Sequence, residues 1–251
     1  MGFIGINIGK NMDISIIIPA YNEAKRISPT IQEILEYFTS RKQTFEVLIV
    51  NDGSQDDTDT VVKKISKDND ALKLINLEKN KGKGNAVREG VLVAQGDLIL
   101  ITDADGSSPI NEIERLKKVL QASAADLVVG SRALLSSETL VEARPGRKLF
   151  GRIFNLLVNL IAVPEIKDTQ CGFKLFKKRA AQFLFQKQMF PRYSFDVEIL
   201  CIAHRAGLKI SEVPINWHHV AGSKVNVIRD GIRMAFDTIK ISLYYRRINP
   251  K

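Results

Sequence analysis

The sequence predicts an α/β protein whose mostly parallel sheet carries helices on both faces. Short apolar runs alternate with amphipathic, helix-period segments in units of about 30 residues, which is typical of such a sheet. Polar loops follow several of these runs, as expected where parallel strands end at a ligand site. With 251 residues, 45% of them hydrophobic and 26% charged, the chain is long enough for a sizeable core and has an ordinary globular composition.

The alternation predicts five strands between residues 13 and 130. The apolar runs are short, largely β-branched and bounded by turn formers, which favours buried strands over helices. They cover residues 13–19, 45–50, 72–77, 98–101 and 126–130. Helix-period segments follow the first four runs, over 28–38, about 57–67, up to about 94, and 109–121. Ser28-Pro29 and Ser108-Pro109 predict helix starts with a capping serine and a proline in the first turn.

Four polar loops follow these strands and are expected to meet at one edge of the sheet, because parallel strands share their carboxyl ends. Their residue types suit a nucleoside diphosphate, with carboxylates for the base or ribose and glycine-lysine loops for phosphates. The loops are Pro19-Ala20-Tyr21-Asn22-Glu23, Asn51-Asp52-Gly53-Ser54, residues 81–85 with Lys83, and Asp103-Ala104-Asp105-Gly106. Each loop alone would be ordinary turn chemistry, so the prediction depends on their convergence.

The Asp103-Ala104-Asp105 segment predicts a metal site. Two carboxylates two residues apart point to one side if the extended backbone continues, and Mg²⁺ or Mn²⁺ prefers such oxygen ligands. Gly106 then permits a sharp exit from the strand. The alternative is that the two aspartates are turn or cap residues, as acidic pairs at strand ends often are.

The second half of the chain is basic. Residues 1–130 carry 16 Lys and Arg against 19 Asp and Glu, a net charge of −3, whereas residues 131–251 carry 21 against 9, a net charge of +12. This asymmetry indicates an anionic partner: a nucleic acid, a membrane surface or a phosphorylated substrate. Nucleic acid is not expected, because the basic half lacks the aromatic-interleaved signatures of common binding modules. The two cysteines suggest no disulfide framework.

Two helical patterns in the basic half suit a membrane surface. Residues 149–163 are apolar nearly all round and contain Arg152, so they form either an interfacial helix or a buried domain helix. Residues 227–247 form a basic helical pattern at the end of the chain. No uninterrupted apolar run is long enough to predict a transmembrane helix. Residues 1–12 make a poor signal peptide and are expected to be a flexible extension.

These motifs, in this order, resemble the family 2 glycosyltransferases, inverting enzymes whose nucleotide-sugar-binding α/β fold is called GT-A. The loops at 19–23, 51–54 and 103–105 carry the resemblance to the family. Three motifs of the second half resemble the polyprenyl-phosphate glycosyltransferases, nearest to the dolichyl-phosphate β-glucosyltransferases. They are Asp168-Thr169-Gln170-Cys171-Gly172-Phe173-Lys174-Leu175-Phe176, Ser194-Phe195-Asp196-Val197-Glu198, and Glu212-Val213-Pro214-Ile215-Asn216-Trp217 with Gly222-Ser223-Lys224. The related mannose synthases usually carry a different residue where this chain has Gly106.

The resemblance implies transfer of a hexose, with glucose from UDP-glucose the best match, to a polyprenyl or dolichyl monophosphate with inversion. The implied catalytic residues are Asp105, Asp168, Arg132 and Arg147. The implied nucleotide-sugar-binding residues are Pro19, Ala20, Tyr21, Glu23, Asp52, Lys83, Asp103, Ala104, Asp105 and Gly106. Arg132, Arg147 and Arg152 would hold the acceptor phosphate, and Asp103 and Asp105 would hold Mg²⁺ or Mn²⁺. The alternatives are a GDP-mannose donor and a soluble, non-lipid acceptor.

On this interpretation residues 13–130 form the nucleotide-sugar-binding half and residues 131–251 the acceptor-binding, membrane-proximal half of one catalytic domain. The protein is expected in the cytoplasm, held peripherally at the cytoplasmic face of a membrane. Asp168 either orients the sugar or acceptor, or helps Gln170 to hold the turn before Phe173. The carboxylates of Asp196 and Glu198 suit the start of a helix better than chemistry. The three arginines are alternatively ordinary surface residues.

Two other enzyme classes fit the sequence less well. A nucleotidyltransferase would share the α/β and metal logic, but a glycine-rich loop with a basic residue does not follow the first strand. A processive polysaccharide synthase is not expected, because the Gln-x-x-Arg-Trp motif is missing. The sequence therefore favours a single transfer to one acceptor.

Overall fold

A computed structural model describes residues 12–134, 136–142, 154–220 and 227–247. Seven strands form one sheet in the order β3-β2-β1-β4-β7-β5-β8. They are β1 (Ile14–Ala20), β2 (Phe45–Asn51), β3 (Leu72–Asn76), β4 (Leu98–Ile101), β5 (Leu127–Ser131), β7 (Lys174–Lys177) and β8 (Ile210–Pro214). Neighbouring strands are parallel except at β7, which is antiparallel to both β4 and β5. The prediction of a mostly parallel sheet is confirmed.

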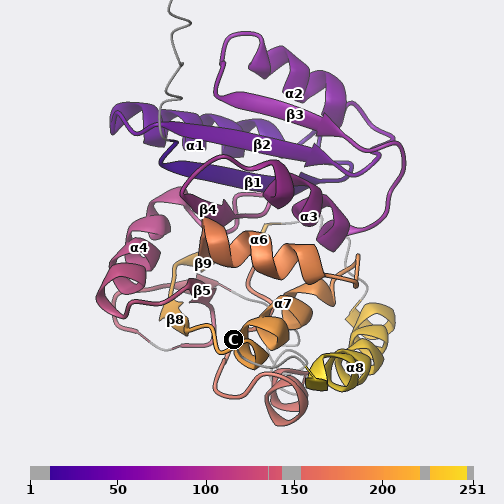
Figure 1. Cartoon of the computed structure of the whole chain (residues 1–251). Coiled ribbons are helices and arrows are strands. Elements are labelled where there is room, and N and C mark those ends of the chain that lie inside the picture. Colours follow the sequence, from indigo (N-terminus) through magenta and orange to yellow (C-terminus); the bar gives the residue numbers. More distant parts are fainter. Residues whose placement is uncertain (1–11, 135, 143–153, 221–226, 248–251) are drawn as a thin grey trace, which may run out of the picture.

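Helices cover both faces of this sheet (Figure 1). They are α1 (Ile27–Ser40), α2 (Thr58–Ser66), α3 (Lys83–Val93), α4 (Ile113–Ala122), α6 (Lys178–Lys187), α7 (Phe195–Arg205) and α8 (Val227–Tyr244). Helices α1, α2 and α4 lie on one face, and α3, α6 and α7 lie on the other with α8 packed outside α7. Short 3₁₀ helices, η1 (Ile110–Glu112) and η2 (Tyr245–Arg247), a further helix over 154–161, and the parallel pair β6 (Val141–Glu142) and β9 (Trp217–His218) complete the fold.

The core sits where the sheet is covered on both faces. In β1, Ile14, Ile16, Ile17 and Ile18 are each 1% exposed or less, so consecutive side chains are buried on opposite faces. This is why the strand is a continuous β-branched run without polar alternation. The same arrangement leaves the strand ends as the places where polar side chains can gather.

Two expected helix starts are wrong, and one strand was missed. Helix α1 begins at Ile27 with Arg26 at its N-cap, so Ser28 and Pro29 lie inside the first turn. Pro109 has extended backbone and precedes η1, so the second Ser-Pro pair instead lies just ahead of its helix. Strand β7 was not predicted, because four residues with a lysine at each end give neither an apolar run nor alternation.

The C-terminal elements are anchored to the core through Tyr245. This hydroxyl lies 2.6 Å from Glu198 Oε1 and 2.8 Å from the Lys187 carbonyl oxygen, and the residue is buried. Burial raises the pKa of Glu198, and the Tyr245 hydroxyl opposes that shift by donating to the carboxylate. Ser194 Oγ donates to Asp237 Oδ2 at 2.7 Å and joins α8 to the start of α7.

Tyr245→Phe is expected to lower the free energy of unfolding by about 1–2 kcal/mol, because the buried Glu198 carboxylate loses the hydroxyl that donates to it. Urea unfolding followed by circular dichroism measures this change. Tyr244→Phe is the matched control, since Tyr244 is 61% exposed. Equal stability of the two variants would contradict the anchoring role of Tyr245.

Candidate active site

The loops at the ends of β1 and β2 are bonded to each other. Asn22, which has a positive φ of 54°, donates its N–H to Ser54 Oγ at 2.9 Å, and its Oδ1 accepts the Gln55 N–H at 2.7 Å. Glu23 N–H donates to Thr58 Oγ1 at 2.8 Å. Pro19 and Ala20 end β1 directly before this loop, and Tyr21 is half-buried within it. The predicted convergence of these two loops is therefore observed.

Asp52 fastens the third loop to this pair. Its carboxylate is 2% exposed and accepts the N–H groups of Lys81 at 2.9 Å and Gly82 at 2.8 Å. Burial raises the pKa of Asp52, and the two N–H donors oppose that shift without cancelling it. Gly82 needs its φ of 111° and its bare Cα here, because a Cβ would lie 2.6 Å from the Pro191 carbonyl oxygen. Both carboxylate oxygens of Asp52 hold this loop, and its contact with the nucleotide base stays a prediction.

Lys83 opens α3 and faces the loop after β4. Its Nζ donates to Asp103 Oδ1 at 2.5 Å, and the Asp103 side chain is 39% exposed. The surrounding protein by itself raises the pKa of Asp103, but the Lys83 ammonium, with help from Arg132, brings it below its usual value. Asp103 is therefore a carboxylate at neutral pH, and it lies in a strongly cationic environment.

Asp105 lies beyond a turn rather than on a continuing strand. The backbone leaves β4 at Ile101, so Asp103 and Asp105 are not aligned by strand alternation, and that part of the expectation is wrong. Asp105 Oδ1 accepts the Ser107 N–H at 3.1 Å and its Oγ–H at 2.7 Å, while Oδ2 lies 4.0 Å from Arg26 Nη1. Gly106 follows with a φ of 68°, the sharp exit that was predicted.

A cavity opens beside Asp105. It is lined by Arg26, Pro29, Thr30, Glu33, Asp105, Gly106, Pro109, His218 and Val220. The Thr30 hydroxyl donates to the Ala104 carbonyl oxygen at 3.0 Å, which fixes the Asp103–Gly106 turn on α1. The His218 N–H donates to the Ser107 carbonyl oxygen at 3.0 Å and brings β9 to the same turn. Asp105 is thus accessible from solvent through this cavity.

Asp103 and Asp105 fit a divalent cation that takes only a minority of its ligands from the protein. Both are hard oxygen donors at one sheet edge, and Asp105 lines the cavity together with Arg26, whose Nη1 lies 4.0 Å from Oδ2. Across the described ranges, no three His, Cys, Asp or Glu side chains gather closely enough to hold a metal ion by themselves. One or two carboxylates completed by substrate phosphates is the usual arrangement for Mg²⁺.

Arg132 and Asp168 form an ion pair at the end of β5. Arg132 follows β5, and its Nε and Nη2 donate to Asp168 Oδ2 at 2.7 Å and Oδ1 at 2.8 Å, while its N–H donates to Oδ2 at 2.9 Å. Glu212 Oε1 and Oε2 accept the N–H groups of Asp168 at 2.8 Å and Lys167 at 2.9 Å. This fork leaves Nη1 of Arg132 outside the ion pair. Asp168 thus orients Arg132. The sequence had offered two other roles for Asp168: orienting the sugar or acceptor, or holding the turn before Phe173 with Gln170.

The other two predicted arginines, Arg147 and Arg152, lie outside the described residues. The guanidinium carbon of Arg132 lies 5.5 Å from the ring centroid of Trp217, so β9 also borders the Arg132 side. The structure therefore brings together the carboxylates of the Asp103–Gly106 turn, the loops that would bind the donor, and one of the three acceptor arginines.

Comparison with known proteins assigns this chain to a family. The family model for Glycosyl transferase family 2 matches residues 15–185. This chain belongs to glycosyltransferase family 2. A dolichyl-phosphate beta-glucosyltransferase of Trichomonas vaginalis is 40% identical over 241 residues, which are 92% of this chain and 71% of that protein. The dolichyl-phosphate beta-glucosyltransferase of Homo sapiens is 36% identical over 244 residues, 92% of this chain and 75% of its own length.

Solved structures of other glycosyltransferases share the fold. Glucosyl-3-phosphoglycerate synthase from Mycobacterium tuberculosis, crystallised with Mn²⁺, UDP and phosphoglyceric acid, matches with a TM-score of 0.70 at 19% identity, covering 96% of this chain and 80% of that one. Mannosyl-3-phosphoglycerate synthase from Rubrobacter xylanophilus matches with a TM-score of 0.69 at 19% identity, covering 94% and 74%. The GT-A architecture expected of a family 2 glycosyltransferase is confirmed, and the protein is an enzyme of this class.

Sequence reasoning missed a buried ion pair behind the site of this family 2 enzyme. Asp196 and Glu198 lie in the first turn of α7, as expected, but their carboxylates have partners elsewhere. Asp196 Oδ1 accepts from Lys174 Nζ at 2.5 Å, and Glu198 accepts the N–H groups of Met189 and Phe190. The available signal was a lysine inside an otherwise apolar segment, which indicates a buried and paired charge.

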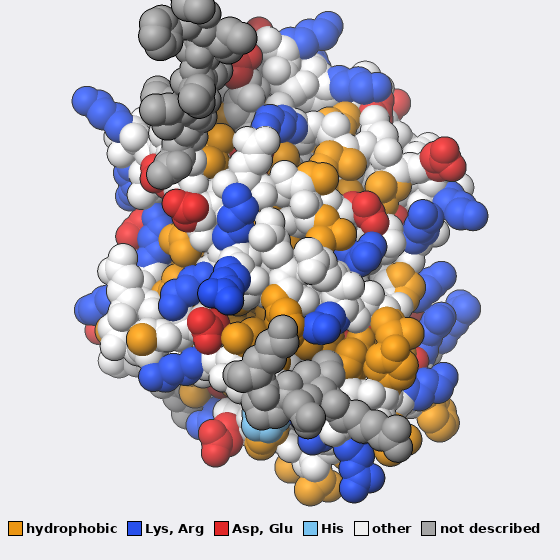
Figure 2. All heavy atoms as spheres, viewed as in Figure 1, with side chains coloured by type: hydrophobic (Ala, Val, Ile, Leu, Met, Phe, Trp, Pro, Cys, Tyr) orange, Lys and Arg blue, Asp and Glu red, His pale blue; other side chains and the backbone are white. Residues whose placement is uncertain are grey.

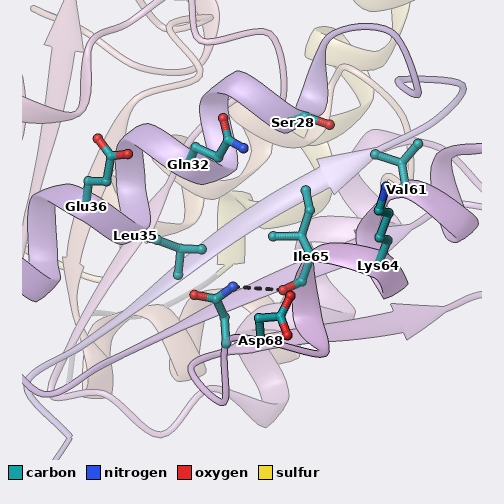
Figure 3. Close-up of a pocket in the computed structure, with 9 residues that line it drawn as sticks. Ser28, Gln32, Leu35, Glu36, Val61, Lys64, Ile65 and Asp68 are labelled. Carbon is teal, nitrogen blue, oxygen red and sulfur yellow. Dashed lines mark hydrogen bonds between the residues drawn. The ribbon is translucent and has the colours of Figure 1, made fainter.

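A second hollow between α1 and α2 lies apart from this site (Figure 3). It is lined by Ser28, Gln32, Leu35, Glu36, Val61, Lys64, Ile65, Asp68 and Asn69, with the Asn69 side-chain amide bonded to the Ile65 carbonyl oxygen at 2.8 Å. None of the loops at the carboxyl edge contributes to it. The candidate active site at the strand ends is therefore separate from this hollow.

Proposed function

We propose that this family 2 glycosyltransferase moves glucose from UDP-glucose to dolichyl phosphate or another polyprenyl monophosphate, with inversion, at the surface of a membrane. The curated relatives that match at 33–40% identity are named dolichyl-phosphate beta-glucosyltransferases. The observation that carries the proposal is the oriented Arg132–Asp168 fork beside the Asp103–Gly106 turn. It offers a fixed cation for an acceptor phosphate next to carboxylates suited to a donor diphosphate.

Residues 13–130 supply the donor side in this proposal. The Pro19–Glu23 loop and Asp52 lie at the nucleoside end, and Lys83 at the diphosphate end. Lys83 now pairs with Asp103, so it is placed to turn from that carboxylate toward a phosphate oxygen. Ala104 and Gly106 contribute backbone, and Gly106 allows the turn to pass close to the ligand.

Asp103 and Asp105 would hold Mn²⁺ or Mg²⁺ against the diphosphate. Glucosyl-3-phosphoglycerate synthase from Mycobacterium tuberculosis, which has a similar fold, was solved with Mn²⁺ and UDP, and this supports a divalent ion at this edge. Such an ion would neutralise the charge that develops on the departing UDP. The Asp105 carboxylate would anchor such an ion, and its bond from the Ser107 hydroxyl keeps the side chain in place.

Residues 131–251 supply the acceptor side. A phosphate monoester is already an anion, so it needs orientation beside another anion more than a general base. Arg132, fixed by Asp168, provides that orientation, and Arg147 and Arg152 stay predictions for the same phosphate. Bidentate fixation matters because it limits the guanidinium to one geometry.

A membrane-facing surface is formed by α8 and residues 154–161. Their exposed apolar side chains, called the apolar face here, are Leu156, Leu160, Ile232, Phe236, Ile239 and Leu243. Ser242 Oγ on α8 donates to the Ile161 carbonyl oxygen at 2.7 Å, so the two helices lie side by side. Arg233, Lys240 and Arg246 are exposed around this face. Apolar and basic side chains gather at the lower part of the molecule where these helices lie (Figure 2).

An apolar face ringed by Lys and Arg fits the headgroup region of an anionic bilayer. No helix within the described ranges has the length and apolar character needed to span a bilayer. The cytoplasmic face is the side we propose, because anionic lipids give that leaflet its negative surface potential.

The double change Leu156→Ser with Leu160→Ser is expected to lower binding to anionic vesicles by roughly tenfold or more, because two leucines would otherwise enter the bilayer interface. Sedimentation with phosphatidylserine-containing vesicles measures the bound fraction. Val93→Ser is the control, since Val93 is 56% exposed on α3, outside this face. Unchanged sedimentation of the double variant would contradict a role of residues 154–161 in membrane binding.

Donor preference tests the rest of the proposal. With dolichyl phosphate as acceptor, we expect the purified protein to release UDP from UDP-glucose faster than it releases GDP from GDP-mannose. A nucleotide-release assay with each donor, with and without Mn²⁺, gives the comparison. Preference for GDP-mannose would favour the mannosyl alternative, and release without acceptor would point to hydrolysis.

A further inference from the structure

Lys174 is a buried lysine that the reaction scheme has not used. Its side chain is 2% exposed, and its Nζ donates to Asp196 Oδ1 at 2.5 Å and to the Cys171 carbonyl oxygen. Asp196 is itself 6% exposed. Desolvating two such charges is costly, and an apolar pair often serves a core equally well. Packing alone therefore does not explain why a charge occupies this position.

The position of Lys174 joins the two sides of the active site. It is the first residue of β7, paired with Ile101 at the end of β4 and with Val129 near the end of β5. Those two strands lead to Asp103 and to Arg132. The Phe173 carbonyl oxygen accepts the Gly130 N–H at 2.9 Å, so the chain just before Lys174 is also fixed to β5.

The residues held by Lys174 rest directly against Asp103. A Cβ placed on Gly172 would lie 2.7 Å from Asp103 Cγ, so the carboxylate packs on bare backbone at this glycine. Cys171, whose carbonyl oxygen accepts from Lys174, is the preceding residue. Lys174 also acts electrostatically on Asp103, together with Lys83 and Arg132. Movement of the 171–172 backbone would consequently shift the support beneath Asp103.

We propose that Lys174, braced by Asp196, is a positioning residue for glycosyl transfer: it fixes the 171–172 backbone and thereby the carboxylate of Asp103. This inference rests on the proposed role of Asp103 in holding the metal and donor diphosphate. Lys174 touches neither substrate nor metal. It acts through the backbone, in the way that partners behind a ligand orient the ligand itself.

The sign of one binding change separates positioning from charge alone. Lys174→Met removes a positive charge near Asp103, and by electrostatics alone this change would tighten Mn²⁺ binding. Displacement of the Asp103 carboxylate would instead weaken Mn²⁺ binding, because a displaced carboxylate is a poorer ligand. A residue that serves only the fold would leave Mn²⁺ binding unchanged in protein that remains folded.

The experiment measures Mn²⁺ binding to the full chain at saturating UDP, using the electron paramagnetic resonance signal of free Mn²⁺. We expect Lys174→Met to weaken Mn²⁺ binding by roughly tenfold. Lys174→Arg keeps the charge and the donors, and should bind more tightly than the methionine variant. Lys177→Met is the matched control on the same strand, because Lys177 is half-exposed and lies 3.9 Å from Asp126 at the other end.

Asp196→Asn is the second variant, in case the methionine variant does not fold. It is titrated with preformed Mn²⁺·UDP, a net anion, whose binding would be tightened by the loss of a negative charge. Weaker binding of Mn²⁺·UDP by this variant would again indicate that the Asp103 carboxylate is displaced. The inference is overturned if folded Lys174→Met binds Mn²⁺ as tightly as the wild type or more tightly. If Lys174→Met is unfolded, the same result with Asp196→Asn and Mn²⁺·UDP overturns it. Absence of any Mn²⁺ and UDP binding by the wild type would instead overturn the proposed function.

Discussion

Asp105→Asn is expected to lower glycosyl transfer by roughly 1,000-fold while leaving the free energy of unfolding nearly unchanged. Asparagine keeps the shape of the side chain and an oxygen to accept from Ser107, which holds Oδ1 in the native turn. It removes the negative charge that we propose binds the divalent ion against the donor diphosphate. Initial rates of UDP release and urea unfolding of the same preparation measure the two quantities separately.

Asp97→Asn is the matched control for this change. Asp97 is exposed and directly precedes β4, the strand whose other end leads to Asp105. The same loss of charge at the amino end of the strand should leave the rate at the wild-type level. Asp105→Asn activity within tenfold of wild type would show that Asp105 holds no essential ion.

Gly172→Ala is expected to lower transfer by about 100-fold, again with a small effect on stability. A Cβ at Gly172 would lie 2.7 Å from Asp103 Cγ, so the carboxylate must move. The obstructing group is the end of a side chain rather than fixed backbone, so the fold can yield cheaply. The rate of transfer is expected to fall, because Asp103 would leave the position in which it faces Lys83 and would face the donor. Rates at several Mn²⁺ concentrations should show a raised requirement for the metal.

Gly231→Ala provides the comparison for a glycine-to-alanine change of no functional consequence. Gly231 lies in α8, and a Cβ there meets nothing within 4 Å. Alanine in a helix should if anything stabilise the protein. A Gly172→Ala enzyme with the wild-type rate and metal requirement would show that the position of Asp103 is not critical.

The first half of the fold was predictable because its signals are local. The run Ile14–Ala20 is buried on both faces, so nearly every side chain is apolar and the strand is evident from composition. The same holds for Phe45–Asn51 and Leu98–Ile101. Loops that end parallel strands must meet at one edge, so placing the donor residues together followed from topology alone.

Strand β7 could not be predicted because its place depends on distant partners. It inserts between β4 and β5, which are consecutive strands in sequence, and runs antiparallel to both. Its first residue, Lys174, is buried only because Asp196, 22 positions further on, neutralises it. Local periodicity contains no information about such a partner.

Sequence reasoning offered candidate residues for the site, but it did not offer the pairings between their side chains. Arg132 was expected at the acceptor phosphate and Asp168 either at the sugar or acceptor or in a turn, whereas the ion pair between them joins residues 36 positions apart. Lys83 was expected at the phosphates, and in the structure it holds Asp103. Sequence indicates which residue types chemistry needs, whereas mutual orientation is set by how β4, β5 and α3 pack.

The most direct test is transfer of radiolabelled glucose from UDP-glucose, with Mn²⁺, to either of two phosphate acceptors. One acceptor is dolichyl phosphate in anionic vesicles, and the other is 3-phosphoglycerate, a soluble phosphate monoester that was crystallised with a synthase of similar fold. We expect label in the organic extract, dependent on Arg132 and Asp105, and little label on phosphoglycerate. Label on the soluble acceptor alone would contradict transfer to a polyprenyl phosphate.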